Sequence, residues 1–273
     1  VESHNIVRPK FHWSTTLTLS HNEQKVDDIG SEDFISAYNS PGNNPYMMYG
    51  YVKGYPLNSL WGFKYGGTWK SAEEREENAV TKTYVGPRYY DTNHDGVLSR
   101  EDLIYQGNAD PYLYGGLQNT FYIHGFKLGV YFAYSLGGKI YNYSEIYMAG
   151  SQFANQYRYM LNAWHPVRNP NSDIPRAGAK SDAALPSDFM IHDASYLRLK
   201  NITLSYTFDL KKKCSWMKDL TLSVSGENLF LWKKYNGFDP DVSSEGTSST
   251  LRRMDLGAYP KPRTIIFSLQ LRY

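Results

Sequence analysis

The sequence of 273 residues has one cysteine, Cys214, and lacks any run of about 18 apolar residues. One cysteine forms no internal disulfide and no zinc cluster of thiolates, and the missing apolar run excludes a membrane-spanning helix. Val1 is followed at once by polar residues, so we expect no signal peptide in this sequence. The net charge of +2 gives no indication of a nucleic-acid partner. These absences do not exclude a membrane protein, because spanning β-strands need only about 10 residues of alternating character.

What the sequence does have is alternation between apolar and polar residues. Aromatic residues make up 16% of it, with 25 tyrosines, and charged residues only 21%. The same period of two recurs in residues 11–20, 126–137, 202–208, 220–227 and 264–273. In the last of these segments one face carries Ile265, Phe267, Leu269, Leu271 and Tyr273, and the other carries Thr264, Ser268, Gln270 and Arg272.

Two all-β architectures alternate in this way, a soluble antiparallel sandwich and a transmembrane barrel. The alternating segments are about 10 to 14 residues long, whereas a usual strand has about 5 to 6. Their polar face carries Ser, Thr, Gly, Gln and Glu, which suits a water-filled interior better than an open surface. We therefore predict an all-β fold, an antiparallel transmembrane β-barrel portion of about seven strands with long extracellular loops. The alternative is a soluble all-β carbohydrate-binding module.

Connections between the predicted strands alternate between short and long. His124 and Gly125 form a tight turn, and a moderate link follows residue 208. Outer-membrane barrels have short periplasmic turns and long external loops. We expect the long links to lie outside the cell, except residues 22–50, which we assign to the periplasm. The external links are residues 67–110, 141–193 and 233–261.

Residues of the predicted external loops are candidates for ligand contact. Residues 144–164 are predicted as a helix that Ser144 caps, because apolar residues recur there at helical spacing. Arg168 and Arg176 would bind acidic groups or brace a loop. The loop aromatics would contact a ligand, a lid or only each other: Tyr141, Tyr143, Tyr157, Tyr159, Trp164 and Tyr235.

The sequence offers little that would catalyse a reaction. No two histidines have the i, i+4 spacing of a helical zinc pair, and a Gly-x-Ser-x-Gly motif, a phosphate loop and a dinucleotide fingerprint are absent. A glycosidase needs two carboxylates about 5 to 10 Å apart, for which Asp239, Asp241 and Glu245 are candidates. These three share one loop, where carboxylates equally suit hydrogen bonding or a cation. We therefore expect no enzyme.

Residues 91–102, DTNHDGVLSRED, have the spacing of a calcium-binding loop. The flanking residues do not form amphipathic helices, which disfavours a calcium sensor of the EF-hand type. Two interpretations stay open, a structural Ca²⁺ site that rigidifies the loop and a turn made by Asp, Asn and Gly. The candidate metal ligands at positions 1, 3, 5, 7, 9 and 12 are Asp91, Asn93, Asp95, the Val97 carbonyl, Ser99 and Asp102.

Six blocks follow one another along the chain: GYPLNSLWGFKYGGTW, YYDTNHDGVLSREDLIYQGNADPYLYGGLQNTFYIHGFKLGVYF, WHPVRNPNSDIPR, ASYLRLKNITLSYTF, LTLSVSGENLFLWKKYNGFDPDV and GAYPKPRTIIFSLQLRY. In this order they resemble the C-terminal part of TonB-dependent outer-membrane transporters of the SusC/RagA-like type, found in Bacteroidetes. The resemblance covers about residues 5–273. It implies a 22-stranded barrel with an internal plug. It further implies TonB-driven import of glycans or peptides through the Gram-negative outer membrane.

The resemblance also implies that residues 1–273 are one part of a longer protein. The plug domain, the N-terminal barrel strands and the segment that contacts TonB would lie in the rest of that protein. The expected partners are a SusD-like lipoprotein lid, the remaining transporter, TonB and outer-membrane lipid. Loop aromatics suit sugar rings, so we expect an oligomeric nutrient, glycan more than peptide.

Overall fold

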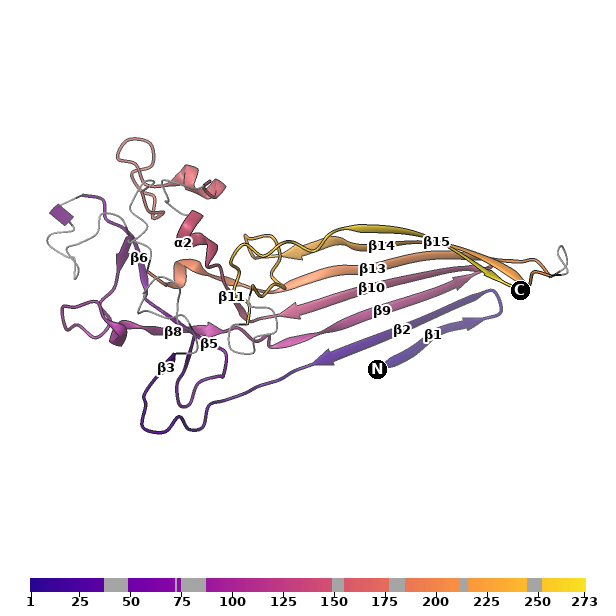
Figure 1. The fold of residues 1–273 in the computed structure, drawn as a ribbon, viewed down its shortest axis with the longest axis horizontal. Helices are drawn as coiled ribbons and strands as arrows, with labels where there is room; N and C mark the ends of the chain where they lie inside the picture. The colour runs from indigo at the N-terminus through magenta and orange to yellow at the C-terminus, as the bar shows by residue number, and fades with distance from the viewer. Residues whose placement is uncertain are drawn as a thin grey trace.

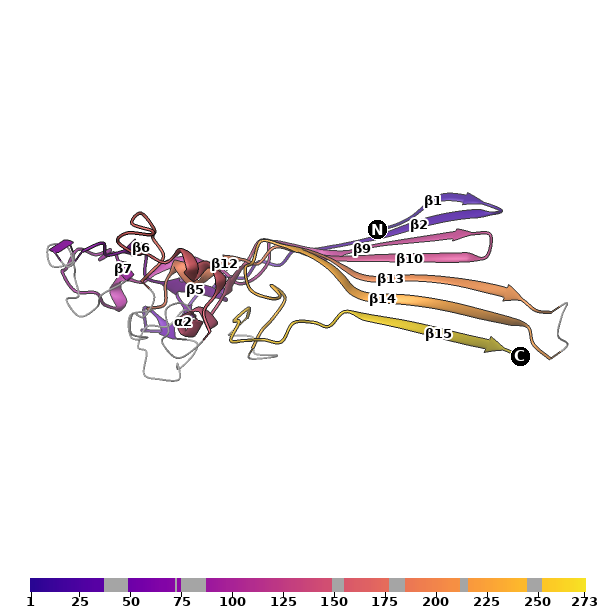
Figure 2. The same cartoon turned by 90° about the horizontal axis from the view of Figure 1, so that it is seen from above.

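The computed structural model describes residues 1–36, 49–71, 73–74, 87–148, 155–176, 185–211, 216–244 and 252–273. It consists of a long antiparallel sheet with a loop-rich region at one end of the strands (Figure 1). Seen from above, the strands fan out as a curved layer that leads away from the loops (Figure 2). Among the described residues, no helix has the length and apolar character needed to cross a membrane.

Seven strands form the long sheet, and every pairing in it is antiparallel. Each strand lies beside the one that precedes it within the sheet, as in an up-and-down barrel wall. The prediction of about seven barrel strands is confirmed. The strands, in spatial order, are β1 (Glu2–Arg8), β2 (Phe11–Ser20), β9 (Leu113–Ile123), β10 (Phe126–Leu136), β13 (Tyr196–Asp209), β14 (Asp219–Lys233) and β15 (Thr264–Arg272).

Cross-strand pairing sorts the side chains of the sheet onto two faces. Successive side chains in a strand point to opposite faces, so neighbouring rows of paired residues belong to different faces. The predicted alternation is confirmed, because apolar and polar rows alternate along the strands. One apolar row contains Trp13, Phe121, Leu128, Leu204, Val224 and Phe267. The adjacent polar row contains His12, Tyr122, Lys127, Ser205, Ser223 and Ser268.

Two glycines in β9 make room for tyrosines of β10. A Cβ atom on Gly116 would stand 2.5 Å from the ring of Tyr131, and one on Gly115 would stand 2.0 Å from the carbonyl oxygen of Thr18. The hydroxyl of Tyr134 passes Gly115 and donates to the same Thr18 carbonyl at 2.7 Å. A side chain at either glycine would therefore displace a ring or a strand.

Short and long connections leave the sheet at opposite ends of its strands (Figure 1). The predicted alternation of short and long links is confirmed, but the assignment of residues 22–50 to the short-turn end is wrong. These residues belong to the long connection between β2 and β9, because the strands that follow them are too short to span a membrane. The short turns are residues 9–10, 124–125 and 210–218, and the long connections are residues 21–112, 137–195 and 234–263.

The loop-rich region is built from short paired strands and short helical turns. Its two-stranded sheets pair β3 (Ile35–Ser36) with β4 (Gly50–Tyr51), β5 (Ser59–Gly62) with β8 (Ile104–Asn108), β6 (Tyr65–Thr68) with β7 (Pro87–Tyr89), and β11 (Lys139–Tyr141) with β12 (Ile191–Asp193). Its helical elements are η1 (Arg100–Asp102), α2 (Ser144–Met148), η2 (Arg158–Asn162) and η4 (Asp188–Met190).

The helix predicted over residues 144–164 is correct only at its start. It begins at Ser144 as α2, and residues 149–154 lie outside the described residues. Residues 155–157 are not helical, and η2 is a 3₁₀ turn, so a continuous helix is wrong. The Ser144 hydroxyl is used for another contact. It accepts a hydrogen bond from the amide of Gly257 at 2.8 Å and donates to the carbonyl of Asp255 at 3.3 Å.

Buried apolar residues gather among the long connections rather than within the sheet. One cluster contains Tyr49, Leu60, Tyr141, Met190 and Met254, which come from all three long connections. A second cluster contains Ile140, Ala194 and Tyr235. The connections therefore pack on one another as a small core at the end of the sheet.

Candidate functional site

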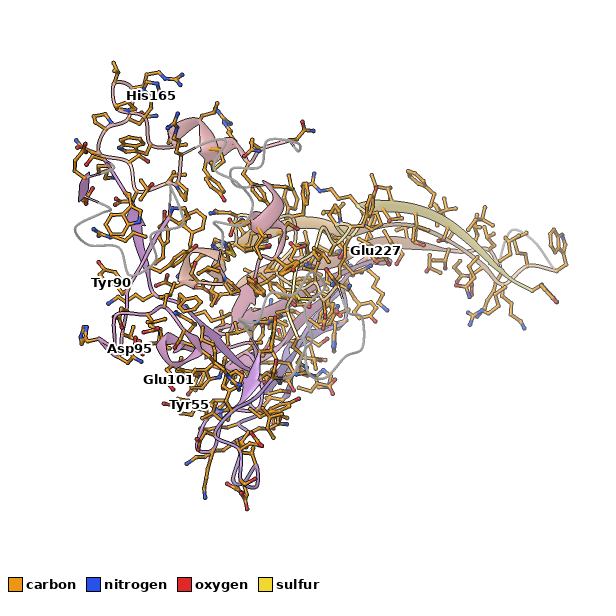
Figure 3. All side chains as sticks on the ribbon, turned by 60° about the vertical axis from the view of Figure 1, so that its left-hand side comes forward. Tyr55, Tyr90, Asp95, Glu101, His165 and Glu227 are labelled. Atoms are coloured by element: carbon orange, nitrogen blue, oxygen red, sulfur yellow. The ribbon has the colours of Figure 1, made fainter. Side chains whose placement is uncertain are left out.

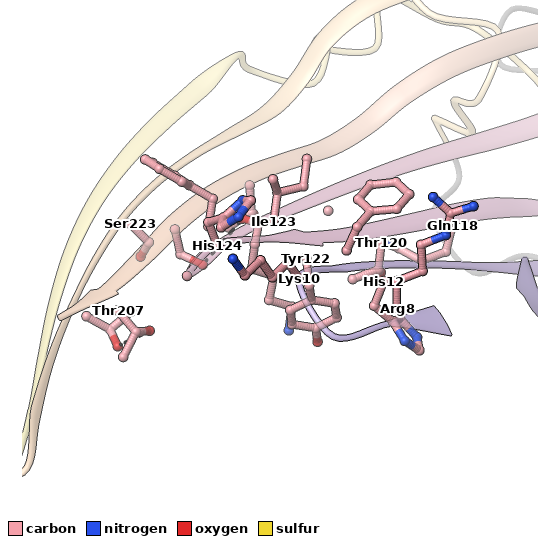
Figure 4. Close-up of a pocket in the computed structure, with 18 of the residues that line it drawn as sticks. Arg8, Lys10, His12, Gln118, Thr120, Tyr122, Ile123, His124, Thr207 and Ser223 are labelled. Carbon is pink, nitrogen blue, oxygen red and sulfur yellow. Dashed lines mark hydrogen bonds between the residues drawn. The ribbon is translucent and has the colours of Figure 1, made fainter. Parts of the chain in front are cut away.

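The polar face of the sheet lines an open hollow of about 910 Å³ near the short turns (Figure 4). Hydroxyl groups on this wall pair across strands, Thr203 with Ser225 at 2.8 Å and Thr207 with Thr221 at 2.9 Å. Gln270 also lines the hollow, so the predicted inward face of the last strand is confirmed. The uncharged polar lining is Gln118, Thr120, Asn201, Thr203, Ser205, Thr207, Thr221, Ser223 and Gln270.

Basic side chains line the same hollow where β1, β2, β9 and β10 meet the short turns. Arg8 and Lys10 lie there with His12 and His124 (Figure 4). Lys127 of β10 lines the same hollow. The ammonium group of Lys127 lies 5.4 Å from the ring centre of Tyr122. The described residues that line the hollow include no aspartate or glutamate. The basic side chains of this chain therefore gather at the short-turn end of the hollow.

The opposite face of the sheet is apolar and exposed. On β15, Phe267 is 82% exposed and Leu269 is 64% exposed, and they pair with Val224 and Leu222 of β14. A soluble monomer rarely exposes an apolar patch larger than a few hundred Å². A membrane barrel instead presents an apolar band to lipid and a polar interior. The two faces of this sheet match the wall of such a barrel.

A buried ion pair joins the sheet to the loops at the long-connection end. Arg198 of β13 donates to Asp239 at 2.5 Å, and both side chains are almost fully buried. Asp241 pairs with Lys261 and so is also compensated by a cation. The two carboxylates are therefore engaged in loop structure, which disfavours the glycosidase interpretation. Glu245, the third candidate, lies outside the described residues.

A second buried polar group lies among the long connections. Glu145 of α2, only 1% exposed, is 2.9 Å from His192 of β12 and accepts a hydrogen bond from Tyr159 at 3.1 Å. The hydroxyl of Tyr235 donates to Asp255 at 2.7 Å. Burial, together with the hydrogen bond to Asp255 and its charge, raises the pKa of Tyr235, so this hydroxyl stays a neutral donor. The contacts of Glu145 lie within the connection of residues 137–195, and that of Tyr235 lies within residues 234–263. The rings of His192 and Tyr235, with centres 5.6 Å apart, bring these two connections together.

The loop aromatics predicted as ligand contacts pack mainly on one another. Tyr141 and Tyr235 are both 2% exposed and belong to the buried clusters. Tyr157 and Tyr159 stack with ring centres 5.5 Å apart. The other two, Tyr143 and Trp164, contact the Tyr141 ring and the Pro170 carbonyl, respectively. Arg168 and Arg176 are exposed, and no ion pair involves either within the described part of the chain.

The acidic loop 91–102 uses its carboxylates to accept hydrogen bonds from its own backbone. Asp91 accepts from the amides of His94 at 2.7 Å and Gly96 at 2.8 Å. Asp95 accepts from the Val97 amide at 2.8 Å. The third carboxylate, Asp102, is fully buried and accepts from the amides of Thr92 and Ser99 at 2.7 and 2.8 Å. Such hydrogen bonds from backbone amides to Asp side chains are typical of a turn, so they favour the turn interpretation of the motif.

The remaining candidate ligands take part in the same loop structure. The Asn93 side chain accepts from the Asp95 amide and donates to the Asp95 carboxylate, both at 3.0 Å. Ser99 caps η1, and Val97 is exposed. Within the described residues, no three His, Cys, Asp or Glu side chains are grouped so as to hold a metal ion. The calcium site stays a prediction.

The surroundings of loop 91–102 differ from those of an EF-hand. Strand β7 precedes it, and η1 and strand β8 follow it, so no pair of helices flanks it. The loop lies in the connection between β2 and β9, in the loop-rich region where Figure 3 labels Asp95 and Glu101, and away from Glu227 on the sheet. Loop 91–102 is therefore not part of an EF-hand sensor, in which ion binding opens a pair of helices.

No protein-family profile matches the chain. Individual relatives do match it. TonB-dependent receptor P26 of Formosa agariphila is 31% identical over 282 residues, which cover 98% of this chain and 28% of that protein. TonB-dependent receptor SusC of Bacteroides thetaiotaomicron is 26% identical over 277 residues, which cover 98% of this chain and 25% of that protein. The chain is homologous to TonB-dependent receptors over nearly all of its length.

Solved structures show the same fold. The RagAB peptide importer in the open-open state matches with a TM-score of 0.75 at 21% identity, over 100% of this chain and 28% of the matched chain. The RagAB peptide transporter matches with a TM-score of 0.74 at 19% identity, over 99% of this chain and 28% of the matched chain. The seven-stranded sheet therefore has the fold of a portion of such a barrel, and the similar receptors are outer-membrane barrels, as the sequence predicted.

The chain spans only 25% to 29% of the length of the curated TonB-dependent receptors it matches. These relatives are named as receptors, and the solved neighbours as a peptide importer or transporter, rather than as enzymes.

Sequence reasoning identified both faces of the sheet but missed the basic side of the hollow. Lys10, His124 and Lys127 all lie at or beside predicted turns, but only the order of the strands shows that they lie together.

Proposed function

We propose that the chain is part of an active importer of oligomeric nutrients that is energised through TonB. The observation that supports this is homology to TonB-dependent receptors over 98% of the chain. The fold agrees, because the sheet has one face suited to lipid and one polar face that lines a hollow. The neighbouring folds belong to proteins named as importers or transporters, which makes import the function we assign to the whole protein.

We place the chain in the C-terminal part of that importer, with the plug domain and N-terminal barrel strands in the rest of the protein. Strands β1 and β15 are the two edges of the sheet. An open edge would leave unpaired backbone groups in lipid, so further strands must pair with both edges. The TonB contact belongs to the part outside this chain. A SusD-like lipoprotein lid is the partner that the relationship to SusC suggests.

For the cargo, we favour a glycan over a peptide. The loop aromatics no longer support this choice, because the structure packs them on one another. The support comes instead from the wall of hydroxyl and amide groups, which can exchange hydrogen bonds with a hydroxyl-rich oligomer. The RagAB neighbours are named for peptide transport, so peptide uptake is the competing outcome.

Uptake in living cells tests the proposed function. The gene for the full-length protein would be deleted, and uptake of fluorescent oligosaccharides and oligopeptides measured with and without a proton uncoupler. We expect the deletion to abolish uptake of at least one oligosaccharide, and the uncoupler to do the same in wild-type cells. Unchanged uptake of every oligomer after deletion would contradict import. Loss of peptide uptake alone would assign the cargo to peptides.

The soluble carbohydrate-binding module is disfavoured by the apolar face. Phe267 and Leu269 are more than half exposed on β15, and so is Tyr273 directly after it. In water this face would promote association, whereas in a barrel it would contact lipid. Purification of the native protein separates the two possibilities. The importer is recovered with detergent as a protein much larger than 31.4 kDa, and a water-soluble monomer of 31.4 kDa would support the module.

A further inference from the structure

We propose that the lipid-facing side of the sheet binds the phosphate headgroups of anionic phospholipids at its short-turn end, through Lys211 and Lys218. This inference goes beyond import, because it concerns the membrane around the protein and not the cargo. Both lysines belong to the short connection between β13 and β14, and both are exposed. An exposed ammonium group binds phosphate as a compact point charge.

Strand pairing places Lys218 on the outward side of the sheet. In the last outward row that joins β14 to β15, Leu220 pairs with Leu271. The ladder continues past this row, because the amide of Lys218 donates to the carbonyl of Arg272 at 2.8 Å. Side chains alternate along a strand, so Lys218 and Tyr273 hold the next outward positions, where the Lys218 ammonium donates to the Tyr273 carbonyl at 3.2 Å. A plug inside the barrel would not cover this side of the wall.

The depth of these positions corresponds to the headgroup region of a membrane. Outward rows run along β13 from Leu197 to Phe208, and the row that contains Phe267 lies near their middle. Tyr273 follows Phe267 by six residues, which is about 15 Å of depth at a rise of about 3.3 Å per residue and a tilt of about 40°. Half of a typical apolar band is about 12 Å. Lys218 and Tyr273 therefore lie just beyond the hydrocarbon.

The positive charge at this end of the sheet is largely uncompensated. The connection of residues 210–218 contains four lysines and no acidic residue. Of the two aspartates that flank it, Asp219 already has an ion pair with β15, and Asp209 accepts from the Lys211 amide. Within the described residues, neither Lys211 nor Lys218 takes part in an ion pair. The long connections at the other end contain 23 acidic and 18 basic residues, so the excess of positive charge belongs to the sheet and its short turns.

Aromatic residues on the outward side complete a lipid-binding surface. Phe126, Tyr206 and Phe208 form a chain of contacts, with ring centres 4.5 and 4.6 Å apart. Beyond them Trp216 is 67% exposed and Tyr273 is 86% exposed. Trp and Tyr concentrate at the membrane–water interface, and lysines there extend the ammonium group toward the headgroups. Basic residues at this level are attracted to anionic lipids. Apolar surface, rings and ammonium groups thus match the acyl chains, the interface and the phosphate of one lipid layer.

Photocrosslinking to lipid tests this inference on the full-length protein. Leu271→benzoylphenylalanine would place a photoreactive group one outward row away from Lys218. The protein would be reconstituted in vesicles of equal parts phosphatidylglycerol and phosphatidylcholine, and the two crosslinked lipids would be quantified by mass spectrometry. The test variant combines Lys211→Gln and Lys218→Gln. The control variant combines Lys25→Gln and Lys53→Gln, which remove the same charge at exposed positions of the first long connection. Heat-modifiable gel mobility would check that each variant is folded.

We expect the wild-type lysines to capture phosphatidylglycerol in excess of phosphatidylcholine. The test variant should lower this ratio about fivefold, since each exposed ion pair contributes a factor of about two to three. The control variant should keep the wild-type ratio. A variant that combines Lys211→Arg and Lys218→Arg should keep it as well, because the positive charge is retained at both positions.

Three results would overturn the inference. The first is equal capture of the two lipids by the wild-type lysines. The second is the same ratio in the test and control variants, which would assign any preference to other groups or to overall charge. The third is capture of neither lipid, because the outward side at this level would then not contact the membrane. The vesicles contain no cargo, so these results are independent of whether the protein imports a nutrient.

Discussion

Replacing Phe267 with arginine would place a charge on the apolar face of β15. Phe267 is 82% exposed there and pairs with Val224 of β14. In the membrane this position faces hydrocarbon, where a charge has no partner and loses its hydration. The opposite face tolerates charge, because Gln270 lines a hollow of hydroxyl and amide groups in which an added charge keeps its hydration. Phe267→Arg and Gln270→Arg thus add the same charge to the two faces of one strand.

The size of the effect follows from the depth of each position. Outward rows run along β13 from Phe208 to Leu197, which are 11 residues apart, and the bulge between Leu199 and Asn201 takes up one of these residues. The row is therefore about 33 Å long at a rise of about 3.3 Å per residue. At a strand tilt of about 40° this becomes about 25 Å, the height of a typical apolar band. Phe267 pairs through Val224 with Leu204 and so lies near the middle of this band. We expect Phe267→Arg to cost about 2 to 4 kcal/mol.

Leu269 provides an internal scale. It lies two residues closer to the short turns, which is about 5 Å less depth at the same tilt. Leu269→Arg should cost about 1 to 2 kcal/mol, because the penalty falls toward the interface. Gln270→Arg should cost less than about 0.5 kcal/mol, as most surface substitutions do.

The assay uses the full-length protein. Folded yield in the outer membrane would be measured by heat-modifiable gel mobility, and stability by urea unfolding in lipid vesicles. The expected order of loss is Phe267→Arg, then Leu269→Arg, then Gln270→Arg. Equal yields for Phe267→Arg and Gln270→Arg would refute the assignment of faces. A larger loss for Gln270→Arg would show that the two faces are reversed.

Three further predictions concern other parts of the chain. Asp239→Asn should destabilise the protein by about 3 to 5 kcal/mol in urea unfolding, because it leaves the buried guanidinium of Arg198 without a charge partner; no loss would mean that the pair is not buried in the assembled barrel. Gly116→Ala should lower folded yield, and Tyr131→Ala in the same protein should restore it, since the added Cβ meets that ring; a loss without rescue would contradict this contact. Calcium should protect residues 91–102 from proteolysis more than magnesium does, since the loop offers several oxygen ligands; equal cleavage with and without calcium would leave the loop as a turn only.

The barrel strands could be predicted from sequence because each of them carries its own evidence. A strand between lipid and a wet interior must alternate, and a span of about 10 residues makes that alternation easy to see. Residues 126–136 and 264–272 formed strands with the expected face on each side. Here the local pattern and the environment impose the same period.

The loop-rich region could not be predicted in the same way, because its structure depends on contacts between distant segments. Ser144 was expected to cap a helix, but its hydroxyl is used by residues 255 and 257 of another connection. Tyr141 and Tyr235 were expected at a ligand site and are instead buried where the connections meet. A single sequence contains no periodic signal for such long-range packing.

The basic side of the hollow was missed for a related reason. Arg8, Lys10 and Lys127 lie on different segments, and each alone looks like an ordinary charge beside a turn. Only the pairing of β2 with β9 and of β9 with β10 brings them to one face. The order of strands in the sheet therefore had to be known before the charge cluster could be seen.

Site-directed spin labelling of β15 in the full-length protein tests the central claim most directly. Single cysteines would be placed at each residue from 264 to 272, in a cysteine-free background and in lipid vesicles, and the accessibility of each label to oxygen and to a water-soluble nickel complex compared. The account predicts a period of two, with oxygen access highest at residues 265, 267, 269 and 271 and nickel access highest at 268 and 270. High nickel access at every position, or no alternation between the two reagents, would contradict the claim that this sheet is the wall of an outer-membrane barrel.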